Sequence, residues 1–180
     1  MLVAALFALL VYRLVDSGGG ARLASEIRAG KKPAAPPFAL KVIWPRTETW
    51  PARLRRAATS GRLSLSELRG YPTVINFWAS WCTPCAAEAA RLAESARKHR
   101  GRIVFVGVDV NDFRSDARRF LRRHHVNYVS LQASGSSISD SYGLIGLPET
   151  YYLDGEGRVV SRTVGQVSRA KLQAGLARLG

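Results

Sequence analysis

Two short apolar runs mark the centre of the predicted fold. Thr73 to Trp78 and Arg102 to Val108 are rich in β-branched and aromatic residues, and their continuous apolarity predicts strands covered on both faces. A helix is predicted between them, from Thr83 and Pro84 to about His99, because proline is tolerated in the first turn of a helix. The apolar stripe that this helix turns inward consists of Cys85, Ala89, Leu92, Ala93 and Ala96.

Strands and helices continue to alternate along the second half of the chain. An arginine-rich amphipathic helix is predicted after Asp109, and a strand over Val126 to Leu131. Thr150 to Leu153 and Arg158 to Thr163 predict a hairpin, and Ser168 caps a last helix. This alternation predicts an α/β sandwich, and the closing hairpin makes its central sheet mixed.

The first part of the chain predicts an attachment segment followed by a spacer. Residues 1–15 are almost entirely apolar, but a helix needs about 20 such residues to cross a bilayer. We therefore expect an anchor or a signal-like segment, with an apolar helix packed on the domain as the alternative. Glycine- and proline-rich stretches within residues 16–35 predict a flexible tether. The domain is expected over residues 36–180; residues 44–61 within it are unassigned, an insertion being one interpretation.

An N-terminal anchor places the domain at the cell membrane, on the extracytoplasmic side. Glutathione and thioredoxin do not keep thiols reduced in that compartment, so disulfides persist there. The 180 residues include 27 Lys and Arg against 13 Asp and Glu, a net charge of +14. Most of the basic residues are arginines spread along the chain, which indicates a solvated surface. Contact with an anionic membrane surface fits this charge, and no specific nucleic-acid partner is expected.

The composition also limits the class of protein and its possible sites. With 47% hydrophobic residues, the chain has the apolar content of a globular domain, which excludes disordered and collagen-like classes. It has two cysteines, Cys82 and Cys85, so one chain can form neither a disulfide framework nor a four-thiolate zinc site. Both cysteines lie in one Cys-x-x-Cys motif.

The position of this motif predicts different roles for its two sulfurs. Cys82 falls where a strand leads into a helix, and unpaired backbone N–H groups together with the helix dipole stabilise a thiolate there. Cys82 is therefore the predicted nucleophile. Cys85 lies one turn into the helix on its inward stripe, from which it can resolve a mixed disulfide. Histidines at 99, 124 and 125 do not complete a metal site, so the only redox group expected is the Cys82–Cys85 disulfide, with no metal or other cofactor.

Two segments resemble the TlpA-like branch of the thioredoxin superfamily, which includes the ResA- and CcmG-type tethered reductases of cytochrome c maturation. They are Asn76 to Glu88, with the sequence NFWASWCTPCAAE, and Tyr142 to Thr150, with the sequence YGLIGLPET. The resemblance covers roughly Pro36 to Gly180. It implies a thioredoxin-like three-layer α/β/α sandwich and thiol–disulfide oxidoreductase activity.

The resemblance implies a proton-relay role for Glu88. This residue matches the family's buried acid, whose pKa burial raises, so that it can exchange a proton with Cys85. The alternative is a solvated glutamate paired with Arg91 or Arg97. The sequence departs from cytosolic thioredoxins at Asn76, where they carry an aspartate; Glu88 would have to serve instead.

The same resemblance implies a substrate site around the sulfurs. Pro148 would be a cis-proline facing the disulfide, since a cis bond before proline costs only about 0.5–1 kcal/mol. The backbone at Leu147 would then pair with an extended substrate segment. Beside the nucleophile, Trp81, Thr83 and Pro84 are the expected substrate contacts.

These inferences lead to one main functional hypothesis and two alternatives. The main one is a membrane-tethered enzyme that reduces protein disulfides, with apocytochrome c as a candidate substrate and a transmembrane electron donor. A peroxiredoxin-type peroxidase is the first alternative, although it favours a Thr-x-x-Cys setting and Cys82 follows Trp81 instead. A non-catalytic, metal-carrying module of the same fold is the second.

Overall fold

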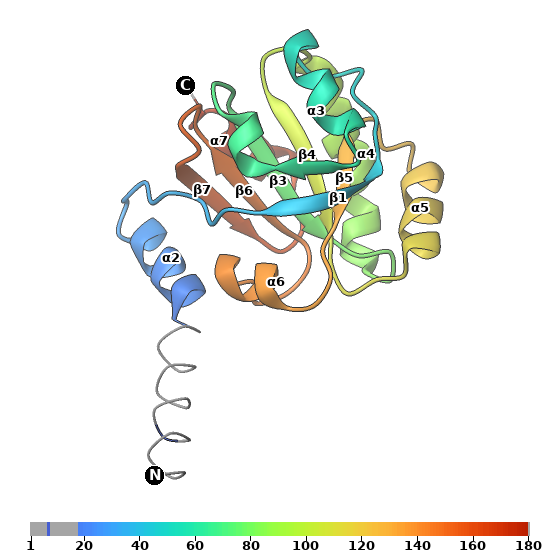
Figure 1. The fold of residues 1–180 in the computed structure, drawn as a ribbon. Coiled ribbons are helices and arrows are strands. Elements are labelled where there is room, and N and C mark those ends of the chain that lie inside the picture. The colour runs from blue at the N-terminus through green and yellow to red at the C-terminus, as the bar shows by residue number, and fades with distance from the viewer. Residues whose placement is uncertain (1–6, 8–17, 180) are drawn as a thin grey trace.

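A seven-stranded mixed sheet forms the centre of the molecule (Figure 1). The computed structural model describes residue 7 and residues 18–179. The strand order is β2-β1-β5-β4-β3-β6-β7; β3 pairs with β4 and β4 with β5 in parallel, and the other pairs are antiparallel. The strands are β1 (Ala39–Trp44), β2 (Arg62–Ser64), β3 (Thr73–Trp78), β4 (Val104–Asp109), β5 (Val129–Gln132), β6 (Glu149–Leu153) and β7 (Val159–Val164).

Helices cover both faces of this sheet. The helices are α2 (Gly19–Arg28), α3 (Arg55–Thr59), α4 (Thr83–Lys98), α5 (Arg114–Arg123), α6 (Ser137–Tyr142) and α7 (Arg169–Leu176), with 3₁₀ turns η1 (Ala52–Leu54) and η2 (Leu65–Leu68). Buried residues of α2, α3 and α6 belong to one apolar cluster, and those of α4, α5 and α7 to another. The predicted α/β/α sandwich with a mixed sheet is confirmed.

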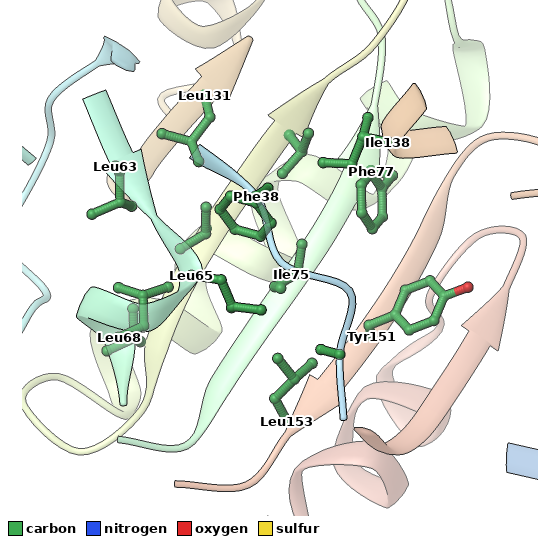
Figure 2. Packing of buried hydrophobic residues seen from close by; sticks show 14 of the residues in the cluster. Phe38, Leu63, Leu65, Leu68, Ile75, Phe77, Leu131, Ile138, Tyr151 and Leu153 are labelled. Atoms are coloured by element: carbon green, nitrogen blue, oxygen red, sulfur yellow. The ribbon is translucent and has the colours of Figure 1, made fainter. Parts of the chain in front are cut away.

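The central strands divide their side chains between the two clusters. Ile75 and Phe77 of β3 join the first cluster, part of which Figure 2 shows, whereas Val74 and Trp78 join the second. Every residue of β3 and β4 is buried, as continuous apolarity predicts. Strand β4 begins at Val104, later than predicted. The backbone N–H of Arg102 still donates to the carbonyl of His99, directly after α4.

The structure differs from the prediction of a flexible tether over residues 16–35. Helix α2 packs on α6 with Leu23 buried, and Gly20 lies so close that an added Cβ would be 2.2 Å from the carbonyl oxygen of Asp140. Ala35 further donates its N–H to the carbonyl of Gly157 at 3.0 Å. A glycine run indicates a linker only when nothing approaches it; here the missing side chain permits close helix packing.

The stretch 44–61 is part of the core in this structure. Its Trp50 is fully buried and donates its indole N–H to the carbonyl of Phe105 at 3.0 Å. Leu54 and Ala58 are buried in the same cluster as β3 and β4 residues. Two short helices thus cover the sheet where the sequence pattern showed no regular element.

The predicted apolar segment 1–15 lies outside the described residues, except for Phe7. Among the residues that the structure describes, no helix has both the length and the apolar character needed to cross a bilayer.

Candidate functional site

A disulfide joins Cys82 and Cys85 at the start of α4. Cys82 is the N-cap residue, and its Sγ accepts a hydrogen bond of 3.2 Å from the backbone N–H of Cys85. Both side chains are nearly covered, with exposed fractions of 4% for Cys82 and 2% for Cys85. The N–H group and the positive end of the helix therefore favour negative charge on the Cys82 sulfur once the bond is reduced.

The short loop before Cys82 is held by the segment that follows β4. Ser80 donates its backbone N–H and its hydroxyl to the two carboxylate oxygens of Asp112, at 2.5 and 2.9 Å. The indole N–H of Trp81 donates to the carbonyl of Asn111 at 3.0 Å. The sequence pattern did not identify Asn111 and Asp112 as contacts of this loop. The topology could have predicted this contact, because β3 and β4 are parallel neighbours and the loops that follow them start at the same edge of the sheet.

Three predicted substrate contacts surround the covered sulfur. Trp81, Thr83 and Pro84 are exposed, Trp81 to 63%. Trp81, Thr83 and Cys82 also line a groove of about 330 Å³. The structure therefore brings these residues together around Cys82, the predicted nucleophile, while their contact with substrate stays a prediction.

Glu88 is buried one turn after Cys85 on the same helix. Its Oε1 accepts from the side-chain amide of Asn76 at 2.8 Å, and its Oε2 accepts from the backbone N–H of Val167 at 2.5 Å. Burial raises the pKa of Glu88 from 4.5 to about 7, although the bonds from Val167 and Asn76 and the charge of Arg91 oppose this shift. A carboxyl group of this kind can take up and return a proton near neutral pH.

The alternative of a solvated Glu88 paired with arginine is wrong. The side chain is fully covered, and the guanidinium of Arg91 donates to the carbonyl of Val167 instead, at 2.6 Å. Asn76, the departure from cytosolic thioredoxins, orients the acid and also donates to the hydroxyl of Thr150 at 3.1 Å.

A second buried acid, Asp109, was missed by sequence reasoning. It ends β4 in register with Trp78, the last residue of β3. Its Oδ2 accepts from the side-chain amide of Gln132 at 3.0 Å, whereas its Oδ1 has no partner among the described residues. Burial, followed by the charge of Asp112, raises the pKa of Asp109 from 3.8 to about 8. The sequence signal that could have identified Asp109 is a carboxylate at the end of a buried strand, beside the loop that carries Cys82.

The loop before β6 lies at the same sheet edge as the disulfide. The peptide bond between Leu147 and Pro148 is cis. Phe77 of β3 pairs with Glu149, so Pro148 continues this register towards the loop that carries Cys82. Leu147 packs against the apolar cluster that contains both cysteines. The structure thus places Pro148 and Leu147 at this end of the sheet, and their roles toward substrate stay predictions.

An ion pair behind the loop fixes its path. Glu149 is fully buried and accepts from the guanidinium of Arg162 at 2.8 Å and from the backbone N–H of Ile145 at 2.8 Å. Arg162 also donates to the carbonyl of Gly143 at 2.8 Å. Through these contacts, Glu149 of β6 and Arg162 of β7 hold the segment from Gly143 to Pro148 against the sheet.

No group of three or more histidine, cysteine or acidic side chains is arranged for metal binding in the part of the chain that the structure describes. The ring of His124 packs on Phe120, with 4.4 Å between the ring centroids. The Nδ1 atom of His99 lies 2.9 Å from the carbonyl oxygen of Ser95.

Comparison with known proteins relates most of the chain to one family. Residues 31–176 match the family described as Redoxin. The thiol-disulfide oxidoreductase ResA of Bacillus subtilis is 27% identical over 112 residues, which span 62% of this chain and 63% of ResA. The thiol:disulfide interchange protein CycY of Rhizobium leguminosarum is 33% identical over 128 residues, which span 70% of this chain and 67% of CycY. The aligned region thus covers less than two thirds of ResA.

The fold is also that of a solved relative. A Chlorobium tepidum protein, named as a thiol:disulfide interchange protein of the DsbE type, superposes with a TM-score of 0.69 at 25% identity. The superposition covers 83% of this chain and 97% of that one. The thioredoxin-like fold and the kinship with ResA-type oxidoreductases, both expected from the motifs, are confirmed.

Proposed function

The chain belongs to the Redoxin family, and we propose that it is a thiol–disulfide oxidoreductase that acts on protein disulfides through Cys82 and Cys85. The hydrogen bond from the backbone of Cys85 to the Cys82 sulfur, at the N-cap of α4, carries this proposal. It gives the two sulfurs different environments, as sequential attack and resolution require. The names of ResA and CycY support the same activity.

In the proposed reaction, two electrons pass from the reduced pair to the substrate. The Cys82 thiolate attacks one sulfur of the substrate disulfide, forms a mixed disulfide and releases the other substrate sulfur as a thiolate, which takes a proton from solvent. Cys85 then gives its proton to the Glu88 carboxylate and attacks the Cys82 sulfur. The internal disulfide forms, and the second substrate thiolate leaves and is protonated from Glu88.

Substrate binding is assigned to the exposed residues around Cys82. Trp81, Thr83 and Pro84 would contact the substrate beside the sulfur, and the backbone at Leu147, next to Pro148, would pair with an extended substrate segment. Because the cysteine side chains are nearly covered, the substrate disulfide has to enter the groove next to them.

The proposed direction is reduction, on the extracytoplasmic side of a membrane, with residues 1–15 as the anchor. Apocytochrome c is the candidate substrate. Nothing else in the described residues supplies electrons, so a transmembrane donor would regenerate the dithiol. Equilibration with glutathione would test the direction: a potential near −270 mV, as in thioredoxin, fits a reductant, whereas about −120 mV, as in DsbA, would assign an oxidase.

Trapping on insulin, a protein with accessible disulfides, tests the activity itself. The reduced Cys85→Ser variant should accumulate a covalent adduct on Cys82, because no second sulfur is present to resolve it. The reduced Cys82→Ser variant is the matched control and should form none. Non-reducing mass spectrometry measures the adduct; absence from the first variant, or equal amounts on both, would contradict the proposed function.

A further inference from the structure

The groove at the disulfide is lined by residues at the start of α4 and by residues of α5. Helix α5 is at the right of Figure 1. Its volume is about 330 Å³. Cys82, Trp81 and Thr83 line one side, and the other side is lined by Arg119, Arg123 and His124. Any segment that reaches the Cys82 sulfur from this groove therefore passes along two arginines.

The walls of the groove are fixed by contacts beneath them. Phe120 forms part of the lining and is stacked on Trp78, with 4.6 Å between the ring centroids. Trp81 is held on the opposite side by its bond to the carbonyl of Asn111. The groove therefore exists before a partner binds, which limits the ordering cost of binding.

The charge of the groove is positive. Arg119 lies 3.2 Å from Asp116, and both side chains are exposed, so the pair contributes little and can exchange partners. Arg123 forms no ion pair with any described residue. Burial, followed by the charges of Arg123 and His125, lowers the pKa of His124, which disfavours a positive charge on this ring. Two guanidinium groups thus face one carboxylate.

The surroundings do not cancel this charge. Helix α5 carries five arginines, at 114, 118, 119, 122 and 123, against the single acid Asp116. Asp112, in the loop after β4, does not line the groove, and both of its carboxylate oxygens accept hydrogen bonds from Ser80. The field at the groove therefore attracts negative groups and repels positive ones.

We infer that this groove selects substrate polypeptides with acidic residues beside the reacting cysteine, through Arg119 and Arg123. This inference rests on the proposed function. The substrate carboxylates would replace Asp116 as the ion-pair partner of Arg119 and would also pair with Arg123. Apolar atoms of the substrate next to them would lie against Trp81. The occupant is an extended polypeptide segment, because it must deliver a disulfide to the covered sulfur of Cys82.

Two peptide disulfides test the inference, identical except that the residues beside the cysteine are glutamate in one and lysine in the other. The reduced full-length protein should reduce the glutamate peptide with a kcat/KM about 3- to 30-fold higher at low salt, and added salt should shrink this ratio. Equal values, or a preference for the lysine peptide, would overturn the inference. Failure to reduce either peptide would instead contradict the proposed function.

Charge reversal separates selection from a structural effect. Arg119→Glu/Arg123→Glu should invert the preference, so that the lysine peptide is reduced faster. The control Arg102→Gln/Arg178→Gln removes two positive charges outside the groove and should keep the wild-type ratio. A charge-reversed protein that still prefers the glutamate peptide would overturn the inference, as would a control that loses the preference.

Discussion

At the scale of single residues, Glu88 shows how burial changes the ionisation of an ordinary side chain, because it raises the pKa of this carboxyl group to about 7. The sequence places it one turn after Cys85, and the family resemblance suggested a buried acid. Its partners come from distant parts of the chain, namely Asn76 in β3 and Val167 before α7. Position in a motif could therefore predict the acid, but not the contacts that orient it.

Replacing this acid should change the pH profile of the reaction. In Glu88→Gln, the rate of disulfide reduction should lose the component that titrates near the raised pKa of about 7, because the amide cannot take a proton from Cys85. The measurement is the single-turnover rate against pH. Glu94→Gln, an exposed position on the same helix, is the control. An unaltered profile in Glu88→Gln would remove the residue from the reaction.

The buried ion pair behind the Pro148 loop should be important for stability. Arg162→Met leaves the fully buried Glu149 without its counter-charge, so we expect a loss of about 3–5 kcal/mol in the free energy of unfolding. Arg158→Met breaks the pairs of a solvent-exposed guanidinium with Asp154 and Glu156 and should cost much less. Urea denaturation measures both. Similar losses in the two variants would argue against a special role for the buried pair.

At the scale of elements, the sequence predicts an element best where its signal is local. The apolar runs predicted β3 and β4, and the proline and the apolar stripe predicted α4. Helix α2 was predicted as part of a spacer because its reason to pack lies in α6, more than a hundred residues away. The hold of Asp112 on the Ser80 loop is likewise a contact between elements, visible only once β3 and β4 are known to be adjacent.

Neighbouring glycines in α2 allow a matched test of its packing. Alanine favours a helix over glycine by about 1 kcal/mol, so Gly19→Ala, which meets nothing within 4 Å, should stabilise the protein slightly. Gly20→Ala should destabilise it by about 1–3 kcal/mol, because its Cβ would meet the backbone of Gly143 at 2.4 Å. Urea denaturation with hydrogen exchange of α2 measures both. Equal effects would show that α2 does not pack on α6.

At the scale of the whole molecule, the buried acids should make stability depend on pH. The folded protein holds the protons of Glu88 and Asp109 more tightly than the unfolded chain does, because burial raises both pKa values. The free energy of unfolding should therefore fall as pH rises from about 4.5 to about 7 through Glu88, and on to about 8 through Asp109.

Urea denaturation of the oxidised protein at about pH 5 and about pH 8 checks this dependence. Glu88→Gln removes one titrating group and should reduce the difference between the two pH values by on the order of 1–3 kcal/mol. The exposed Glu94→Gln should leave the difference unchanged. A wild-type protein that becomes more stable towards pH 8 would contradict the assignment of raised pKa values.

Some features of the whole molecule could be predicted from the sequence and others could not. Composition and alternation predicted one α/β domain, and the motif predicted the redox pair. The buried position of Trp50 and the arginine groove beside Cys82 could not be predicted, because both depend on how non-adjacent segments pack.

The most direct test of the redox site is the ionisation of Cys82. In the reduced Cys85→Ser variant, the rate of alkylation by iodoacetamide reports the fraction of Cys82 thiolate at each pH. We expect the rate to be half-maximal well below the pKa of about 8.5 of free cysteine, because the start of α4 stabilises the thiolate. A half-maximal rate at or above that value would contradict the assignment of Cys82 as the activated nucleophile.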